Sequence, residues 1–414
     1  MSKKVALHNL GCKVNAYEVE AMQQLLEKAG YEIVPFEEGA DIYLINTCTV
    51  TNIADRKSRQ MLHKAKKMNP NAIVVATGCY VQTDTQKLEE DSAVDLILGN
   101  NQKKQIVEAL EEYEKEHTKK VKVIEINKTK EYEDLSIGYT AEHVRAYIKV
   151  QDGCNQFCTY CIIPYARGRV RSRKIAEVLD EVRALAARGY KEVVLTGIHL
   201  SSYGVDFKEE ERESLLSLIQ AVHEVEGIQR IRLGSLEPRI ITEEFMEGIS
   251  SLPKVCPHFH LSLQSGCDKT LRNMNRRYSA AEYAEKCELI RKFYPSPALT
   301  TDVIVGFPVE TEEDFEESYE FVKNIHFYET HIFKYSRRQG TKAAVMEGQL
   351  TEAVKSIRSE KMIALHEIRA KEYETSMIGK TLELLLEEEV EINGKTYFMA
   401  HLSLIHISEP TRQA

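Results

Sequence analysis

The sequence lacks the long apolar runs that would place it in a membrane. No segment approaches the ~20 consecutive apolar residues of a membrane span. The start, Met1-Ser-Lys-Lys, is followed by the short mixed run Val5–Leu10 instead of the apolar stretch of a signal peptide. These absences argue against a membrane-embedded or secreted protein. We therefore expect a cytoplasmic protein without membrane contact.

Acidic residues are absent between Gly153 and Ala176, although the 414-residue chain has a formal net charge of −9. A global charge says little about a local face. In this stretch basic residues alternate with small or apolar ones: Arg167, Arg169, Arg171, Arg173 and Lys174. Such a stripe predicts contact with RNA phosphates beside the cysteine loop that precedes it. A solvated face, or an arginine that binds a cofactor carboxylate, is the alternative.

The nine cysteines, in a chain without a secretion signal, are expected to be reduced and metal-binding rather than disulfide-bonded. Cys154, Cys158 and Cys161 form a C-x3-C-x2-C motif. Three thiolates within eight residues can hold a [4Fe-4S] cluster that leaves one iron open to a substrate or cofactor. A zinc site is the alternative, but no fourth Cys or His follows at a suitable distance.

Residues 1 to about 110 alternate short apolar strands with amphipathic helices. The expected strands are Val5–Leu10, Ile42–Asn46, Ala72–Thr77 and Val94–Leu98, and the expected helices are Tyr17–Ala29, Ala54–Met68 and Lys104–Tyr113. Buried strands separated by helices predict an open parallel α/β sheet.

Three of these strands are followed at once by a cysteine: Cys12, Cys48 and Cys79. The loops at the carboxyl ends of parallel strands share one edge of the sheet, where ligands bind, so the three thiols should converge. We therefore predict a second three-cysteine cluster with an open iron, and buried structural cysteines are the alternative. The other three cysteines have no such spacing and are expected to be structural: Cys256, Cys267 and Cys287.

Residues 111–143 are rich in Glu and Lys and cannot build a core, so we place the domain connection there. A second alternation follows, with strands expected at Val144–Val150, Glu192–Thr196, Ile231–Ser235, His258–Leu263, Leu299–Val305 and Glu329–Lys334. Helices are expected near 174–188, 213–225, 242–251, 279–293, 311–324 and 351–377. Six strand–helix units predict a partial (β/α)6 barrel with its chemistry at the carboxyl ends of the strands.

The C-terminal segment predicts a small all-β remnant. Ile378–Glu387 and Lys395–His401 read as two strands around an Asn393-Gly394 turn. Residues 403–414 fit no strand alternation and are predicted to be a non-native tail. The expected domains are therefore 1–125, 140–377 and 378–402, followed by the tail 403–414.

Two three-cysteine sites in this order resemble the radical S-adenosylmethionine (SAM) methylthiotransferases. The motifs Gly11–Asn15, Asn46–Asn52 and Ile163–Arg169 are most similar to the MtaB type of that family. The resemblance implies a transferase that converts N6-threonylcarbamoyladenosine at tRNA position 37 to its 2-methylthio derivative, with two [4Fe-4S] clusters and SAM. It also implies a monomer that binds the tRNA anticodon stem-loop, a truncated TRAM domain at the C-terminal strands, and a sulfur source and electron donor still to be identified.

The resemblance implies roles for individual residues as well. Cys154, Cys158 and Cys161 are the catalytic cluster ligands at which SAM is cleaved, and Cys12, Cys48 and Cys79 bind the second cluster. SAM contacts are expected from the cysteine loop and the strand ends: Tyr160, Thr196, Gly197, Ser235, Glu237, Gln264 and Asp302. Arg167 and Arg169 are candidates to meet the carboxylate of the threonylcarbamoyl group.

Two other functions are compatible with the same motifs. The first is methylthiolation of isopentenyl-adenosine in tRNA or of a ribosomal-protein aspartate. The second belongs to another class, a non-catalytic iron–sulfur or RNA-binding protein, whose clusters would need neither an open iron nor a SAM pocket.

Overall fold

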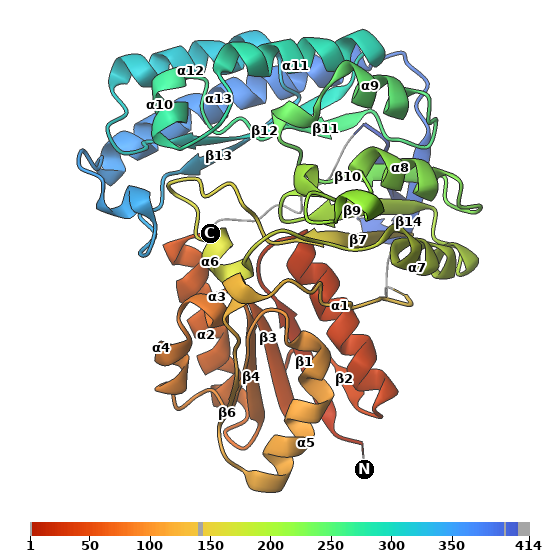
Figure 1. Cartoon of the computed structure of the whole chain (residues 1–414), viewed down its shortest axis with the longest axis vertical. Coiled ribbons are helices and arrows are strands. Elements are labelled where there is room, and N and C mark those ends of the chain that lie inside the picture. Colours follow the sequence, from red (N-terminus) through yellow and green to blue (C-terminus); the bar gives the residue numbers. More distant parts are fainter. Residues whose placement is uncertain (1, 140–143, 393–394, 405–414) are drawn as a thin grey trace.

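The computed structural model describes residues 2–139, 144–392 and 395–404. It contains an N-terminal α/β domain, drawn red to orange in Figure 1, and a larger curved α/β domain, drawn yellow-green to blue. In the described residues no helix has both the length and the apolar composition needed to cross a membrane. The two domains meet at the edge of the N-terminal sheet that carries the first three cysteines.

The N-terminal domain is a six-stranded parallel sheet in the order β2-β1-β3-β4-β5-β6. Its strands are β1 Lys4–Asn9, β2 Glu32–Val34, β3 Ile42–Thr47, β4 Ile73–Gly78, β5 Leu96–Leu98 and β6 Lys120–Lys122. Its helices are α1 Lys13–Lys28, α2 Asn52–Met68, α3 Cys79–Thr83, α4 Thr85–Glu89 and α5 Ile106–Glu116, with 3-10 turns η1 Lys103–Gln105 and η2 Ile126–Lys128. Apolar residues are buried on both faces of the sheet. The predicted open parallel sheet is confirmed.

The second domain is a partial barrel. Its strands are β7 Arg145–Asp152, β8 Arg171–Ser172, β9 Glu192–Gly197, β10 Arg230–Leu233, β11 His258–His260, β12 Ala298–Val305 and β13 Glu329–Lys334. Sheets β10-β9-β7-β8 and β11-β12-β13 are joined by parallel bridges Ile231–Val255 and Leu236–Leu261. The six parallel strands form the predicted (β/α)6 barrel, and the antiparallel β8 is an addition at one edge.

Helices cover the outer face of the barrel (Figure 1). They are α7 Ile175–Ala187, α8 Leu215–His223, α9 Glu243–Ser250, α10 Asp268–Asn273, α11 Ala280–Phe293, α12 Glu312–Ile325 and α13 Glu352–Ser376, whereas the short helix α6 Ile163–Arg167 lies at the junction with the N-terminal domain, against α3. Short 3-10 turns lie between them: η3 Leu200–Ser202, η4 Glu209–Glu211, η5 Pro238–Ile240 and η6 Lys342–Val345. One large apolar cluster packs these helices against the strands.

The connecting segment is more structured than its composition predicts. β6 adds an edge strand to the N-terminal sheet, and Leu135 and Ile137 are buried in the core of the barrel. The backbone N–H of Ile137 donates to Glu181 of α7 at 2.8 Å. The expectation that this polar segment adds nothing to a core is therefore wrong, because two apolar residues suffice to anchor it.

The C-terminal strands β14 Leu384–Ile392 and β15 Lys395–Leu402 form an antiparallel pair. The first strand begins at Leu384 instead of Ile378, and the predicted turn Asn393-Gly394 lies outside the described residues, as do 405–414. The pair is tied to the barrel by Arg230 and Arg232, whose guanidinium groups donate to the carbonyls of residues 401, 383, 403 and 402. That the strands begin a TRAM domain stays a prediction.

Candidate active site

The three N-terminal cysteines lie together at the carboxyl edge of the sheet. A Cβ atom on Gly11 would lie 3.2 Å from Cys48 Cβ, so the loops after β1 and β3 touch. Asn15 holds these loops in place, since its side-chain amide donates to the carbonyls of Leu10 at 2.7 Å and Thr47 at 3.1 Å. The predicted convergence of the strand-end cysteines is observed.

Two of the three cysteines stand at helix starts. Cys12 precedes the first turn of the 16-residue helix α1, and Cys79 is the first residue of α3. Gly78 has φ +99°, and a Cβ there would lie 2.6 Å from the carbonyl oxygen of Thr47, so glycine is required before Cys79. The positive end of the α1 dipole favours a negative group at Cys12.

Side chains donate to the sulfur of Cys79 from both domains. Arg167 Nε lies 3.2 Å and Asn100 Nδ2 3.8 Å from Cys79 Sγ. Burial raises the pKa of Cys48 to about 12, so without a metal this thiol is protonated at neutral pH. A metal would release that proton on binding. Three thiols, two N–H donors and a helix N-terminus fit an anionic iron–sulfur cluster.

The C-x3-C-x2-C motif forms a compact loop after β7. Gly153 has φ +71°, and a Cβ there would lie 1.9 Å from the carbonyl oxygen of Arg169, so only glycine lets the loop turn back on itself. The N–H of Cys154 donates to Gly168 at 3.0 Å, and that of Cys161 donates to Cys158 at 3.0 Å.

The α10–α11 connection holds the other side of the loop. Thr159 donates from its backbone N–H to Met274 at 3.0 Å and from its hydroxyl to Asn273 at 2.8 Å. Arg276 Nη1 lies 3.3 Å from Cys158 Sγ. No sequence pattern distinguishes Arg276 from the neighbouring Arg277, so the analysis of motifs missed it.

A small cavity adjoins two cysteines of this loop. A cavity of about 110 Å³ is lined by Cys158 and Cys161 together with Phe157, Thr159, Tyr165, Thr341 and Lys342. Burial raises the pKa of Cys154 to about 11 and of Cys161 to about 12. Three thiols with a cationic donor, Arg276, therefore fit a second cluster.

Most of the residues predicted to contact SAM follow barrel strands on this same rim. Glu237 is buried and accepts from Arg239 at 2.8 Å, and its charge acts on Cys154. Gln264 is buried in a left-handed conformation, φ +72°, after β11. Tyr160 packs edge-on against Phe307. The remaining predicted positions at this rim are Thr196, Gly197 and Ser235.

Two residues that the sequence analysis did not select join this rim. Gln151, at the end of β7, accepts from the N–H of His199 at 2.8 Å, and a Cβ on Gly197 would lie 2.8 Å from Gln151 Oε1. Burial lowers the pKa of His199 to about 4, so this imidazole is neutral at physiological pH. Gln151 lies at the end of β7 and His199 follows β9, and this position at the carboxyl end of a barrel strand could have identified both as candidate site residues from the sequence.

Asp302 lies in a different polar group inside the barrel. Its carboxylate is 3.3 Å from His260 Nε2, and His260 stacks on His331 with ring centroids 5.6 Å apart. Ligand atoms of these three residues lie within 4.8 Å of one another. Burial, together with the charges of Arg145 and Arg232, lowers the pKa of Lys13 to about 8. The positive charge of Lys13 in turn acts on the carboxylate of Asp302. A cation beside this group does not favour a bound metal ion.

The prediction that five basic residues form an RNA-binding surface is wrong for three of them, because their side chains are buried. Arg167, Arg171 and Arg173 are 0%, 1% and 2% exposed, so they do not face RNA or meet a substrate carboxylate. Arg167 pairs with Glu18 across the domain interface, and Arg171 and Arg173 pair with Asp152 and Glu181 within the barrel domain. Arg169 is exposed and its guanidinium lies over Phe157 at 4.5 Å. Lys174 lies over Phe207 and pairs with Glu211 at 2.8 Å.

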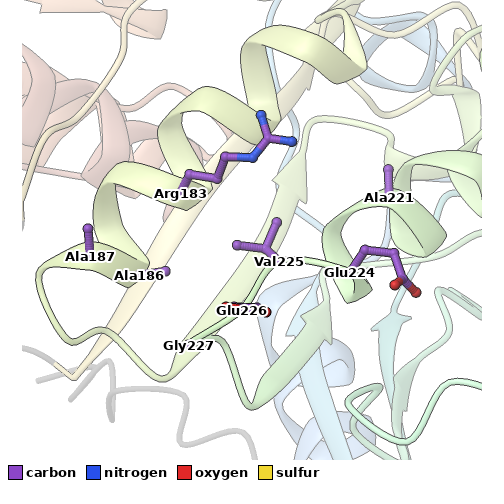
Figure 2. A pocket seen from close by; sticks show the side chains of 8 residues that line it. All are labelled: Arg183, Ala186, Ala187, Ala221, Glu224, Val225, Glu226 and Gly227. Carbon is purple, nitrogen blue, oxygen red and sulfur yellow. The ribbon is translucent and has the colours of Figure 1, made fainter.

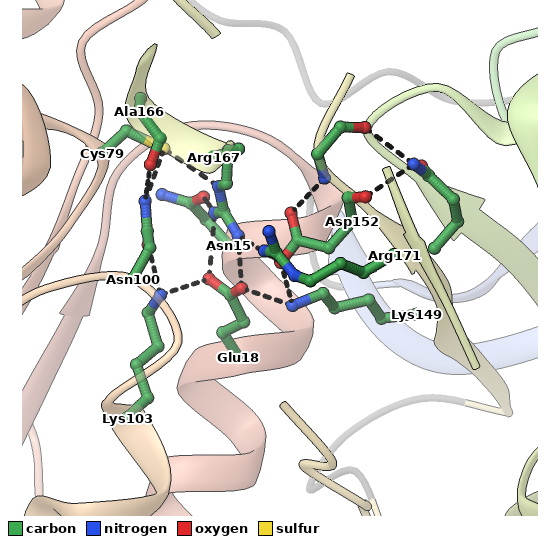
Figure 3. A network of polar contacts seen from close by, with 12 residues as sticks. Asn15, Glu18, Cys79, Asn100, Lys103, Lys149, Asp152, Ala166, Arg167 and Arg171 are labelled. Carbon is green, nitrogen blue, oxygen red and sulfur yellow. Dashed lines mark hydrogen bonds and ion pairs between the residues drawn. The ribbon is translucent and has the colours of Figure 1, made fainter. Parts of the chain in front are cut away.

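Arg167 and Arg171 belong to a buried charge network where the two domains meet, shown in Figure 3, whereas Arg173 pairs separately with Glu181 of α7. Arg167 and Glu18 of α1 form a bidentate pair, and Lys103 and Lys149 lie 3.1 and 2.9 Å from the same carboxylate. Burial alone would raise the pKa of Glu18, but the three cations hold it well below its usual range. Arg167 follows Cys161 by six residues and donates to Cys79, so the chain segment after the C-x3-C-x2-C loop reaches the N-terminal cysteine site.

A larger hollow lies elsewhere. Figure 2 shows a space of about 570 Å³ between α7 and the α8–β10 connection, lined by Arg183, Ala186, Ala187, Ala221, Glu224, Val225, Glu226 and Gly227. It contains no cysteine and lies on the outer side of the barrel. The chemistry of the protein is therefore assigned to the cysteine sites and not to this hollow.

Comparison with known proteins agrees with both sites. Residues 4–99 match "Uncharacterized protein family UPF0004" and residues 148–322 match the radical SAM superfamily. Two solved structures share the fold: a radical SAM methyltransferase, TsrM, from Kitasatospora setae (TM-score 0.60, 15% identity, 81% of this chain and 72% of that one) and the radical enzyme OxsB (TM-score 0.53, 11% identity, 89% and 56%).

Closer similarity is found to curated proteins. The threonylcarbamoyladenosine tRNA methylthiotransferases MtaB of Bacillus subtilis and Aquifex aeolicus are each 44% identical, over 93% and 95% of this chain and 85% and 95% of their own lengths. A tRNA-2-methylthio-N(6)-dimethylallyladenosine synthase of Thermoanaerobacter pseudethanolicus is 36% identical over 92% of this chain and 81% of its own. With two cysteine sites on the two sides of one domain interface and 44% identity to these MtaB proteins, the chain belongs to the MtaB-type radical SAM methylthiotransferase family.

Proposed function

We propose that this protein adds a methylthio group to C2 of N6-threonylcarbamoyladenosine at position 37 of tRNA. The observation that carries the proposal is that Arg167, from the helix that follows the C-x3-C-x2-C loop, donates to Cys79, so the two three-cysteine sites lie on the two sides of one domain interface. The MtaB proteins that are 44% identical carry this activity in their names. The protein acts in the cytoplasm as a monomer.

The two steps of the reaction, radical formation and sulfur transfer, are assigned to cysteine sites on different domains. When bound, SAM and the cluster on Cys154, Cys158 and Cys161 would supply a radical able to take hydrogen from an unactivated carbon, and the cluster on Cys12, Cys48 and Cys79 would hold the sulfur to be transferred. Around the first site, SAM is held by Tyr160, Thr196, Gly197, Ser235, Glu237 and Gln264. Asp302, which lies 3.3 Å from His260 Nε2, completes the predicted set.

The neighbouring side chains position the cysteines and adjust their charge. Arg276 donates to Cys158, and Arg167 and Asn100 donate to Cys79, so each site carries at least one fixed donor. Hydrogen bonds to cluster sulfurs and local charge are established means by which proteins tune clusters. The anticodon loop, being single-stranded, can present an unstacked adenine to such a site.

Arg169 and Lys174 are the residues of the basic stripe that remain available to tRNA, and Arg169 is the more exposed of the two. We expect Arg169→Gln to weaken binding of an anticodon stem-loop and to reduce the slope of log K against log salt by about one unit, because one phosphate contact fewer releases fewer counterions. Fluorescence anisotropy at several salt concentrations measures this slope. Arg183→Gln, on the outer helix α7, is the matched control and should leave the slope unchanged. An unchanged slope in Arg169→Gln would remove this residue from the RNA interface.

A further inference from the structure

The buried charges behind Cys79 are not balanced among themselves. Four cations and two carboxylates form the contact network of Figure 3: Lys103, Lys149, Arg167, Arg171, Glu18 and Asp152. All six are 3% exposed or less. Glu133 stands beside the network and accepts from the N–H of Lys104, but even a full charge on Glu133 leaves the cations in excess.

An uncompensated buried charge costs several kcal/mol, so an excess of cations here calls for a negative group in contact with the network. The network reaches the cysteines through Arg167. Its Nε donates to Cys79 Sγ at 3.2 Å, while its two terminal nitrogens are held by Glu18 and, at 2.6 Å, by Asn15. Every nitrogen of this guanidinium therefore has a hydrogen-bond partner, and only Nε donates to a sulfur atom.

We propose that Arg167 is a positioning residue of the N-terminal cluster: the barrel domain supplies it to fix Cys79 and to raise the reduction potential of the cluster that Cys12, Cys48 and Cys79 hold. This inference rests on the assignment of these cysteines as cluster ligands. A hydrogen bond to a ligand sulfur and a nearby positive charge both stabilise the more negative, reduced state. Arg167 supplies the hydrogen bond and the Lys103–Lys149 pair extends the positive field behind it.

The position of Arg167 also gives it a role between the domains. It ends α6, the helix that begins two residues after Cys161, and the carbonyl of the preceding Ala166 accepts from Asn100, the other donor to Cys79. The cluster loop of the barrel and the sulfur of the N-terminal site are thus joined by one short rigid segment. A shift of one domain relative to the other would therefore change the hydrogen bonds that Cys79 receives from Arg167 and Asn100.

The test measures the midpoint potential of the N-terminal cluster in the full chain with Cys154, Cys158 and Cys161 replaced by alanine, so that only one cluster is present. Arg167→Gln is expected to lower the ratio of reduced to oxidised cluster at a fixed potential about tenfold, which is 59 mV for one electron. Arg167→Lys keeps the charge and should shift it less. Glu18→Gln removes the counter-charge and should shift the potential in the opposite direction.

Arg173→Gln is the matched control, since Arg173 is equally buried and pairs with Glu181 without touching a cysteine in the structure. Equal potentials in Arg167→Gln and Arg173→Gln, or shifts of the same sign in Arg167→Gln and Glu18→Gln, would overturn the inference. The Arg167→Gln variant could lose its iron altogether. In that case, loss of iron from Arg173→Gln as well counts against the inference, whereas an Arg173→Gln variant that keeps its iron supports it. If the parent protein holds no iron, the ligand assignment fails instead.

Discussion

Replacing Cys154, Cys158 and Cys161 together with alanine is expected to abolish 2-methylthio formation and still leave about four irons per chain after anaerobic reconstitution. Activity is lost because SAM has no open iron to bind. Iron is retained because Cys12, Cys48 and Cys79 form a separate site on the other domain, held by Asn15 and by the strand ends. Iron analysis and nucleoside mass spectrometry give the two readouts.

The matched control replaces Cys256 and Cys287, which are buried in the barrel. This double variant should bind as much iron as the unmodified chain, since neither residue lies in a three-cysteine site. Complete loss of iron from the triple variant would contradict an independent N-terminal cluster. Full activity of the triple variant would contradict radical SAM chemistry at the C-x3-C-x2-C loop.

A stem-loop with N6-threonylcarbamoyladenosine at position 37 is expected to be turned over far faster than one with isopentenyl-adenosine. The inside of the barrel beside Cys12 is polar, with Lys13, His260, Asp302 and His331 acting on one another. A site built for hydrogen-bonding groups leaves them unpaired when an apolar group enters, which costs factors of ~10⁴–10⁵.

The comparison uses two stem-loops that differ only at position 37, with the rate of product formation followed by mass spectrometry. A third stem-loop with unmodified adenosine separates recognition of the side chain from recognition of the RNA. Equal or faster turnover of the isopentenyl form would contradict the MtaB-type assignment. It would favour the activity in the name of the Thermoanaerobacter pseudethanolicus relative, a tRNA-2-methylthio-N(6)-dimethylallyladenosine synthase.

The architecture could be predicted from the sequence because its strands are short, apolar and bounded by helices. All ten predicted α/β strands are present, and the cysteines after β1, β3 and β4 converge as the parallel topology requires. The strands β2 and β6 were missed, since three-residue edge strands bury little and Lys120-Val-Lys122 has no apolar pattern. Edge strands of this kind are defined by their partner and not by their own composition.

The charge interface could not be predicted in the same way. Arg167, Arg171 and Arg173 read as a surface stripe because arginine is rarely buried without a partner. Their partners, Glu18, Asp152 and Glu181, lie elsewhere in the sequence, and no local pattern announces the pairs. Of these pairs only Arg167–Glu18 crosses between the domains, and this contact could be found only from the structure.

The most direct test of the proposed activity is nucleoside mass spectrometry of tRNA from a strain that lacks its own MtaB-type gene, with and without this chain. The prediction is that 2-methylthio-N6-threonylcarbamoyladenosine appears only when the chain is present, and that the variant lacking Cys154, Cys158 and Cys161 does not restore it. Unmodified threonylcarbamoyladenosine in both strains, or the appearance of the isopentenyl product instead, would contradict it.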